Sequence, residues 1–134
     1  MHGTGTDPTP ARLDLEHHPA AARRARTFVQ DQCHAVGIND DTSETAVLLT
    51  SEIVTNAFLH GRSRTTLILS ATEDRLRVEV GDDNTRLPHL ADPDREALNG
   101  RGLAIVDMLA ADWGADAQRQ GKIVWFELVR PPRR

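Results

Sequence analysis

Small and apolar side chains recur along two stretches of the chain with the three- and four-residue spacing of amphipathic helices. In the first stretch these positions are Ala22, Ala25, Val29, Cys33 and Val36. Pro19 stands near the start of this stretch and Gly37 directly follows it, as is typical of helix ends. The pattern predicts a helix from Pro19 to about Val36.

The second helical stretch is DDTSETAVLLTSEIVTNAFLHG at 40–61. Acidic and hydroxyl residues at its start suit helix capping and the helix dipole, and Gly61 suits a helix end. Its apolar positions cover most of the circumference of a helical wheel, so this helix is expected to be buried on several sides.

Five further runs have the two-residue alternation of β-strands. ARLDLEH at 11–17 predicts a short edge strand, and TTLILSA at 65–71 pairs with RLRVEVG at 75–81 as a hairpin. The runs DWGADAQ and GKIVWFELV predict a second hairpin near the end of the chain.

Residues 82–100 lack a sustained hydrophobic period, which predicts a long loop. In the following run, GRGLAIVDMLAA, glycines precede a predicted helix that ends at about Ala111. The order of elements is strand, two helices, two strands, long loop, helix and two strands. This order predicts an α+β protein, a two-layer α/β sandwich in which about three helices cover one face of a mixed, mostly antiparallel sheet.

Composition adds few restrictions. The 134 residues are enough for one domain, expected at 12–130, with a flexible lead-in at 1–11 and a basic tail at 131–134. The net charge of -4 offers no basic surface for nucleic acid, and no apolar run is long enough to cross a membrane. No signal sequence is evident, so we expect a cytoplasmic protein. The single cysteine, Cys33, cannot form an intramolecular disulfide, and we expect it to be a small buried hydrophobe.

Glu52 and Asn56 are the unusual residues of the second helix, because they lie on one narrow edge, about 40° apart on the wheel. Burying a carboxylate and an amide without partners is costly, so each must meet protein groups, a ligand or a metal ion. A pair of polar side chains on a solvated strip is the simpler alternative.

Two other positions point to chemistry. Asp82 shares its strand parity with Leu76, Val78 and Val80, so it should face the helices, where its carboxylate could accept a hydrogen bond from an exocyclic amine. NGRGL at 99–103 opens a helix, where free N–H groups favour phosphate. A turn-forming Asp and an ordinary glycine turn are the alternatives.

These motifs, in this order, resemble the GHKL ATPases, whose ATP-binding fold is shared by gyrase, Hsp90, histidine kinases and MutL. SEIVTNAFLHG at 51–61 resembles the N-box, VGDDN at 80–84 the first glycine box, and GRGLAIV at 100–106 the second. Together with the closing GKIVWFEL, they are most similar to the small bacterial anti-sigma-factor serine kinases and their actinobacterial relatives. The resemblance spans roughly residues 12–129 and implies a Bergerat-type ATP-binding fold.

The resemblance implies a role for each motif. Asn56 would bind Mg²⁺, Glu52 would be the general base, Asp82 would accept the adenine N6 amine, and residues 84–99 would form a lid. The residues implied to contact the nucleotide are Asn56, Asp82, Asn84, Gly100, Arg101, Gly102 and Leu103.

The chain departs from the family pattern at two places. The first glycine box of the wider superfamily is D-x-G-x-G, whereas this chain has DDNTR at 82–86 and no glycine. Ile123 occupies the place where many relatives carry a threonine that supports the adenine contact.

The function implied is an ATP- and Mg²⁺-dependent serine/threonine protein kinase that phosphorylates an anti-sigma-factor antagonist and so regulates transcription by partner switching. The alternative is a regulatory module with weak or no ATP binding that sequesters a sigma factor or another protein partner. Relatives often form homodimers, so a homodimer is compatible with both. A metal-dependent hydrolase is disfavoured, because the histidines lack the spacing of a zinc site.

Overall fold

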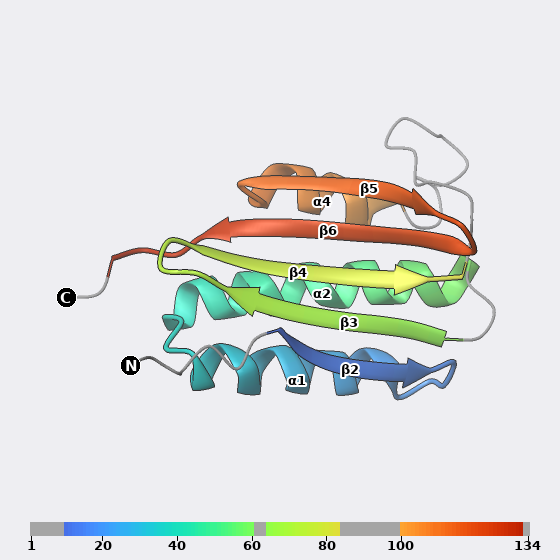
Figure 1. Cartoon of the computed structure of the whole chain (residues 1–134), viewed down its shortest axis with the longest axis horizontal. Helices are drawn as coiled ribbons and strands as arrows, with labels where there is room; N and C mark the ends of the chain where they lie inside the picture. Colours follow the sequence, from blue (N-terminus) through green and yellow to red (C-terminus); the bar gives the residue numbers. More distant parts are fainter. Residues whose placement is uncertain (1–9, 61–63, 84–99, 133–134) are drawn as a thin grey trace.

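The computed structural model describes residues 10–60, 64–83 and 100–132. Its helices lie against one face of a five-stranded sheet, so the fold has two layers (Figure 1). The predicted lid at 84–99 falls outside the described residues, as do most of the expected lead-in and the last two residues of the tail.

The elements follow the predicted order. In the chain they are β2 (Ala11–Glu16), α1 (Ala21–Ala35), α2 (Asp40–His60), β3 (Arg64–Ala71), β4 (Arg75–Asp82), α4 (Gly100–Leu109), β5 (Asp112–Gln118) and β6 (Gly121–Val129). The strand order is β2-β3-β4-β6-β5, and all four ladders between described strands are antiparallel. The predicted two-layer α+β architecture is confirmed, and β2 lies at an edge of the sheet as expected.

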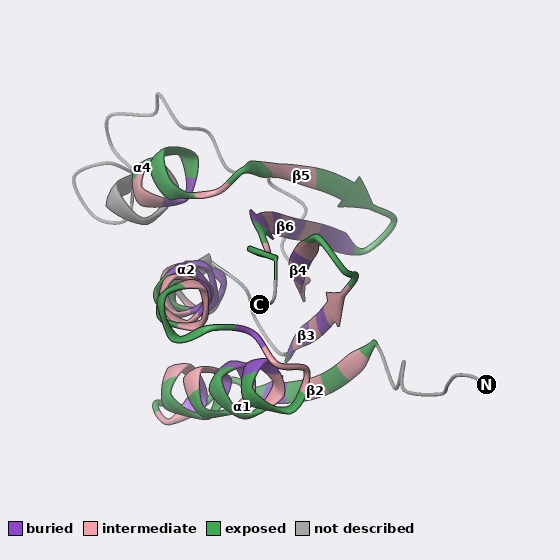
Figure 2. Ribbon diagram, turned by 90° about the vertical axis from the view of Figure 1, so that its left-hand side faces the viewer, coloured by how far each residue is buried: buried purple, intermediate pink, exposed green. Residues whose placement is uncertain are grey.

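The core lies between the sheet and the helices, where alternate residues of each central strand are buried (Figure 2). The predicted inward face of β4, Leu76, Val78 and Val80, is fully buried. Helix α1 buries Ala25, Val29 and Cys33, as its spacing predicted, together with Ala21, whereas the predicted Ala22 and Val36 are only partly buried. Burial of these apolar side chains is the main force that holds the two layers together.

Helix α2 packs against α1, α4 and three strands, which explains why apolar residues cover most of its circumference. Asn39 caps its start, since its Oδ1 accepts a hydrogen bond from the Thr42 backbone N–H at 2.8 Å. Asp40 and Asp41 in the first turn suit the helix dipole. No helix in the described parts is long and apolar enough to cross a membrane.

The face of the sheet that points away from the helices carries a polar network. Arg77 donates to Glu79 and to Glu127, each at 2.9 Å, and its guanidinium lies 4.2 Å from the centre of the Trp125 ring. The Trp125 ring in turn covers Gly114, where a Cβ atom would come within 2.9 Å of it. Charged and aromatic side chains thus cover this face in place of helices.

Arg130 joins three segments directly after the last strand. Its backbone N–H donates to the Asp74 carbonyl, and its guanidinium donates to the Thr72 carbonyl, both at 2.8 Å. The guanidinium also donates to the carbonyl of Val36, at the end of α1. These bonds tie the end of β6 to the β3–β4 turn and to the α1–α2 connection.

Cys33 is fully buried, as predicted, and burial raises the pKa of its thiol. Since the thiolate is the reactive form, we expect reaction with Ellman's reagent at pH 8 to be at least about 100-fold slower in native buffer than in urea. Unfolding lowers the thiol pKa towards about 8.5, so this thiol's contribution to stability falls as the pH rises above that value. Rapid stoichiometric labelling of the native protein would contradict this burial.

Candidate functional site

The predicted site residues belong to elements that meet at one end of the molecule. Glu52 and Asn56 lie in the second half of α2, β4 ends at Asp82, and α4 begins at Gly100. The end of α2, the end of β4 and the start of α4 all lie at the right-hand end of Figure 1. Because α2 packs against both β4 and α4, the fold brings these three elements into one region.

The Asn56 side chain carries an acceptor that the described part of the chain leaves unused. Its Oδ1 atom is buried, and no hydrogen-bond donor among the described residues reaches it. Leaving a buried acceptor unpaired costs about 1–3 kcal/mol, so such an atom calls for an explanation. An amide oxygen is a ligand that Mg²⁺ accepts, usually alongside water and phosphate oxygens. The amide of Asn56 therefore fits the metal role implied by the resemblance.

Glu52 lies one turn before Asn56 and is half-buried. The residue beside it, Ser51, accepts a hydrogen bond from Arg26 of α1 at 3.2 Å, so α1 supports this part of α2. A partly exposed carboxylate on the same edge as Asn56 is compatible with the general-base role that the resemblance implies. Its catalytic role stays a prediction.

Asp82 faces the helices, as its strand parity predicted, and its side chain is only 2% exposed. Lys122 lies directly opposite on β6, and its Nζ is 3.0 Å from each carboxylate oxygen of Asp82. The Lys122 side chain is itself 7% exposed. The candidate base-recognition carboxylate is thus part of a buried ion pair.

Lys122 was not among the predicted site residues, although a signal for it was present. In GKIVWFELV it shares strand parity with the buried residues Val124, Phe126 and Leu128. A lysine at an inward position of a buried strand needs a partner, because an unpaired buried charge is costly. That requirement could have identified Asp82 as its partner.

Ile123 lies on the other side of the sheet. The ladder pairs Asp82 with Lys122 and Gly81 with Ile123, and neighbouring residues of a strand point to opposite faces. The residue beside Asp82 on the helix-covered face is therefore Lys122. Gly121 precedes it and approaches β4 closely, since a Cβ atom there would lie 1.9 Å from the Asp82 carbonyl oxygen.

The second glycine box forms the first turn of α4. The helix begins at Gly100 itself, so Gly100, Arg101, Gly102 and Leu103 all lie inside it, whereas glycines were expected to precede it. The first N–H groups of a helix lack intrahelical acceptors and favour an anion. Asn84, the other predicted nucleotide contact, lies outside the described residues.

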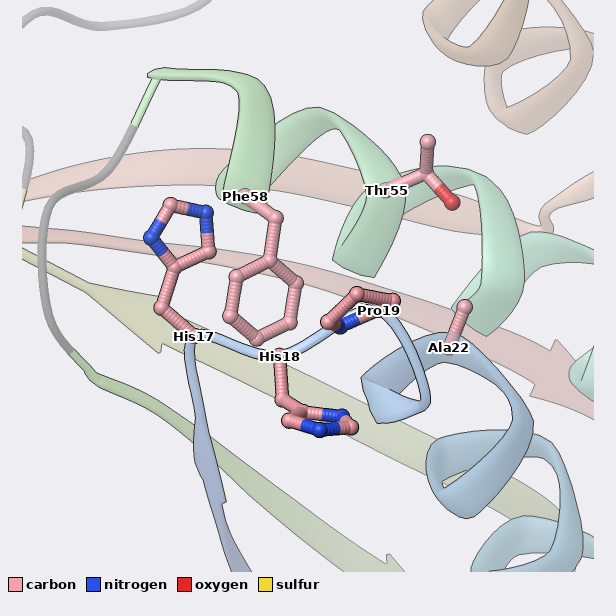
Figure 3. Close-up of a pocket in the computed structure, with 6 residues that line it drawn as sticks. All are labelled: His17, His18, Pro19, Ala22, Thr55 and Phe58. Carbon is pink, nitrogen blue, oxygen red and sulfur yellow. The ribbon is translucent and has the colours of Figure 1, made fainter.

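A separate pocket of about 320 Å³ lies where the β2–α1 connection meets α2 (Figure 3). The His17 ring stacks on Phe58 there, with ring centres 5.1 Å apart and planes inclined by 12°. His18, Pro19, Ala22 and Thr55 complete the lining. None of the predicted nucleotide residues lines this pocket, so it is distinct from the candidate site.

The described residues contain no cluster of three or more His, Cys, Asp or Glu side chains that could hold a metal ion. A cation beside Asn56 would therefore take its other ligands from sources such as phosphate oxygens and water, as is usual for Mg²⁺.

Comparisons with known proteins identify the family and the fold. A family model described as a histidine kinase-like ATPase domain matches residues 15–128. No curated protein sequence matches the chain.

Several solved structures share the fold. The RsbU and RsbW domains of Rv1364c from Mycobacterium tuberculosis match 93% of this chain with a TM-score of 0.67 and 20% identity, and this chain spans 33% of that one. The SiaB–SiaC complex from Pseudomonas aeruginosa matches 89% of each chain with a TM-score of 0.61 and 12% identity. The histidine kinase domain of a blue-light activated kinase from Erythrobacter litoralis matches 81% of this chain and 59% of its own, with a TM-score of 0.50 and 24% identity.

Proposed function

The chain belongs to the family of histidine kinase-like ATPase domains, and we propose that it is an ATP- and Mg²⁺-binding serine/threonine protein kinase that regulates transcription by partner switching. This membership confirms the resemblance to GHKL ATPases on which the predicted residue roles depend. The proposal places the nucleotide where α2, β4 and α4 meet.

The observation that carries the proposal is the buried Oδ1 atom of Asn56, which no hydrogen-bond donor among the described residues reaches. A fold without a ligand at this position would gain by replacing the amide with an apolar side chain, because the unpaired acceptor costs free energy. A bound Mg²⁺ would satisfy that acceptor and would neutralise charge on the phosphate oxygens. This is the simplest reason for an asparagine at this position of α2.

The other residues have matching roles in the proposal. Asp82 accepts a hydrogen bond from the exocyclic amine of the base, and the first turn of α4 at Gly100–Leu103 directs backbone N–H groups at the phosphates. Glu52 accepts the proton of the attacking serine or threonine hydroxyl. The protein substrate would be an antagonist of an anti-sigma factor.

A second candidate is a regulatory module that sequesters a sigma factor or another protein and turns over little or no ATP. The observation that favours it is the ion pair of Asp82, because Lys122 engages both oxygens of the carboxylate that adenine would use. The two candidates differ in phosphoryl transfer and in nucleotide affinity, and both can be measured.

Replacing Asn56 by leucine is expected to separate binding from folding. We expect Asn56→Leu to lose at least about tenfold in ATP affinity in the presence of Mg²⁺, because a cation ligand is removed. Its free energy of unfolding should match or exceed that of wild type by up to about 1 kcal/mol, because an unpaired acceptor is removed as well. Titration calorimetry with ATP, in Mg²⁺ and in EDTA, and urea denaturation measure the two effects.

The matched control is Thr55→Leu, one position away on the exposed side of α2. It should leave the Mg²⁺ dependence of ATP binding unchanged. If folded wild-type protein bound no ATP at millimolar concentration with Mg²⁺, the proposed kinase function would be wrong.

A further inference from the structure

The ion pair between Asp82 and Lys122 places a cation beside the carboxylate that is proposed to recognise the nucleotide base. The two residues are directly opposed in the β4–β6 ladder, and both side chains point to the helix-covered side of the sheet. Lys122 is the only lysine in the sequence: of the 16 lysine and arginine residues, the other 15 are arginines.

The pair combines two complementary hydrogen-bonding groups. An ionised carboxylate only accepts hydrogen bonds and has about four lone-pair sites, whereas an ammonium only donates them. Nζ is 3.0 Å from both Oδ1 and Oδ2 of Asp82. Because an ammonium has three N–H donors, it can keep its contact with one oxygen and direct another N–H at a ligand. Asp82 and Lys122 therefore offer an acceptor and a donor side by side.

Adenine carries the matching pair on one edge, where the N6 amine donates and the adjacent ring nitrogen N1 accepts. Guanine reverses both groups, since its O6 accepts and its N1–H donates. A carboxylate facing O6 and an ammonium facing N1–H would each be left without a partner, which is how polar sites reject a wrong ligand.

We propose that Lys122 is a second base-recognition residue, which donates to N1 of adenine while Asp82 accepts from N6. This inference rests on the proposed nucleotide binding and adds to it a residue that selects adenine over guanine. Ile123 points to the opposite face of the sheet, so the residue next to Asp82 on the inner face is Lys122. The adenine contact expected from a threonine is thus supplied by a charged donor.

The test compares ATP with three analogues, each titrated into the folded wild-type protein with Mg²⁺. 1-Deaza-ATP replaces N1 by C–H, the triphosphate of purine riboside lacks the N6 amine, and GTP reverses both groups. We expect each analogue to bind at least about tenfold more weakly than ATP, because each loses a hydrogen bond to a charged group. For Lys122→Met, the ratio between ATP and 1-deaza-ATP should fall to about 1, while the purine riboside analogue should remain weaker than ATP.

The sole lysine offers a readout that does not depend on the stability of a variant. After labelling with ¹⁵N-lysine, the protein has a single side-chain Nζ resonance, which we expect to shift on addition of ATP and to shift less with 1-deaza-ATP. This measurement on wild type decides the question even if Lys122→Met does not fold.

Two negative outcomes are distinguishable. If ATP bound and 1-deaza-ATP bound equally well, Lys122 would not read N1, and the proposed nucleotide binding would stand without this inference. If ATP itself did not bind to the folded protein, both the proposed function and the role of Lys122 would be overturned.

Discussion

Replacing Glu52 by alanine is expected to lower the rate of phosphoryl transfer by about 10²–10⁴-fold, the usual contribution of a general base. Glu52 shares an edge of α2 with Asn56 and is half-buried, and its proposed role is to accept a proton beside the phosphates and not to bind the base. The affinity for ATP should therefore stay within about twofold of wild type. Transfer is measured from γ-labelled ATP to protein in an extract of the cells that encode this chain, and affinity by calorimetry.

Glu44→Ala is the matched control, because Glu44 lies on the same helix two turns earlier and is exposed. It should leave both transfer and affinity unchanged. Wild-type protein that binds ATP but labels no protein would favour the sequestering module. Equal rates for wild type and Glu52→Ala would show that another group takes the proton.

Replacing Lys122 by methionine is expected to lower the free energy of unfolding by about 3–5 kcal/mol. Methionine fills much of the same space but leaves the Asp82 carboxylate, which is 2% exposed, without the ammonium that the structure places 3.0 Å away. Removing one member of a buried ion pair leaves a buried charge uncompensated, and this accounts for the size of the loss. Urea denaturation followed by circular dichroism measures it.

The double variant Asp82→Asn with Lys122→Met tests whether the uncompensated charge of Asp82 causes this loss of stability. Both charges are then absent, so most of the lost stability should return, since neutral replacements of a buried pair are often as stable as the pair. Arg119→Met, in the exposed β5–β6 turn, controls for the loss of one positive charge. A double variant as unstable as Lys122→Met would place the effect in packing and not in charge.

The fold was predictable because the spacing of apolar residues along the sequence matches the helices and strands that form. The period of 40–61 identified α2, and the alternation of Leu76, Val78 and Val80 identified the inward face of β4. Extending that alternation by two positions placed Asp82 inside, and its side chain is indeed buried. Local periodicity is enough where burial alone decides which way a side chain points.

The partner of Asp82 could not be read in the same way. Asp82 and Lys122 lie 40 positions apart, and only the pairing register of β4 with β6 brings them together. Motif comparison drew attention to Ile123, which the register places on the opposite face. Register depends on the turn and on the packing of the whole sheet, so a sequence motif does not determine it.

The start of α4 is a second feature that the sequence did not predict correctly. Glycines favour turns, so Gly100 and Gly102 were expected to precede the helix, yet both lie within its first turn. The apolar residues that follow, of which Val106 is fully buried, stabilise the helix by packing against α2, and this outweighs the low helix propensity of glycine.

Arg130 has a practical consequence for measurements on this protein. Its bonds to the β3–β4 turn and to the end of α1 hold the chain at the left-hand end of Figure 1, away from the end where Asp82 lies. A tag or fluorophore attached beyond Pro132 therefore leaves the end that carries the proposed nucleotide site facing solution. Immobilisation through that point suits surface-based binding assays with nucleotides and candidate protein partners alike.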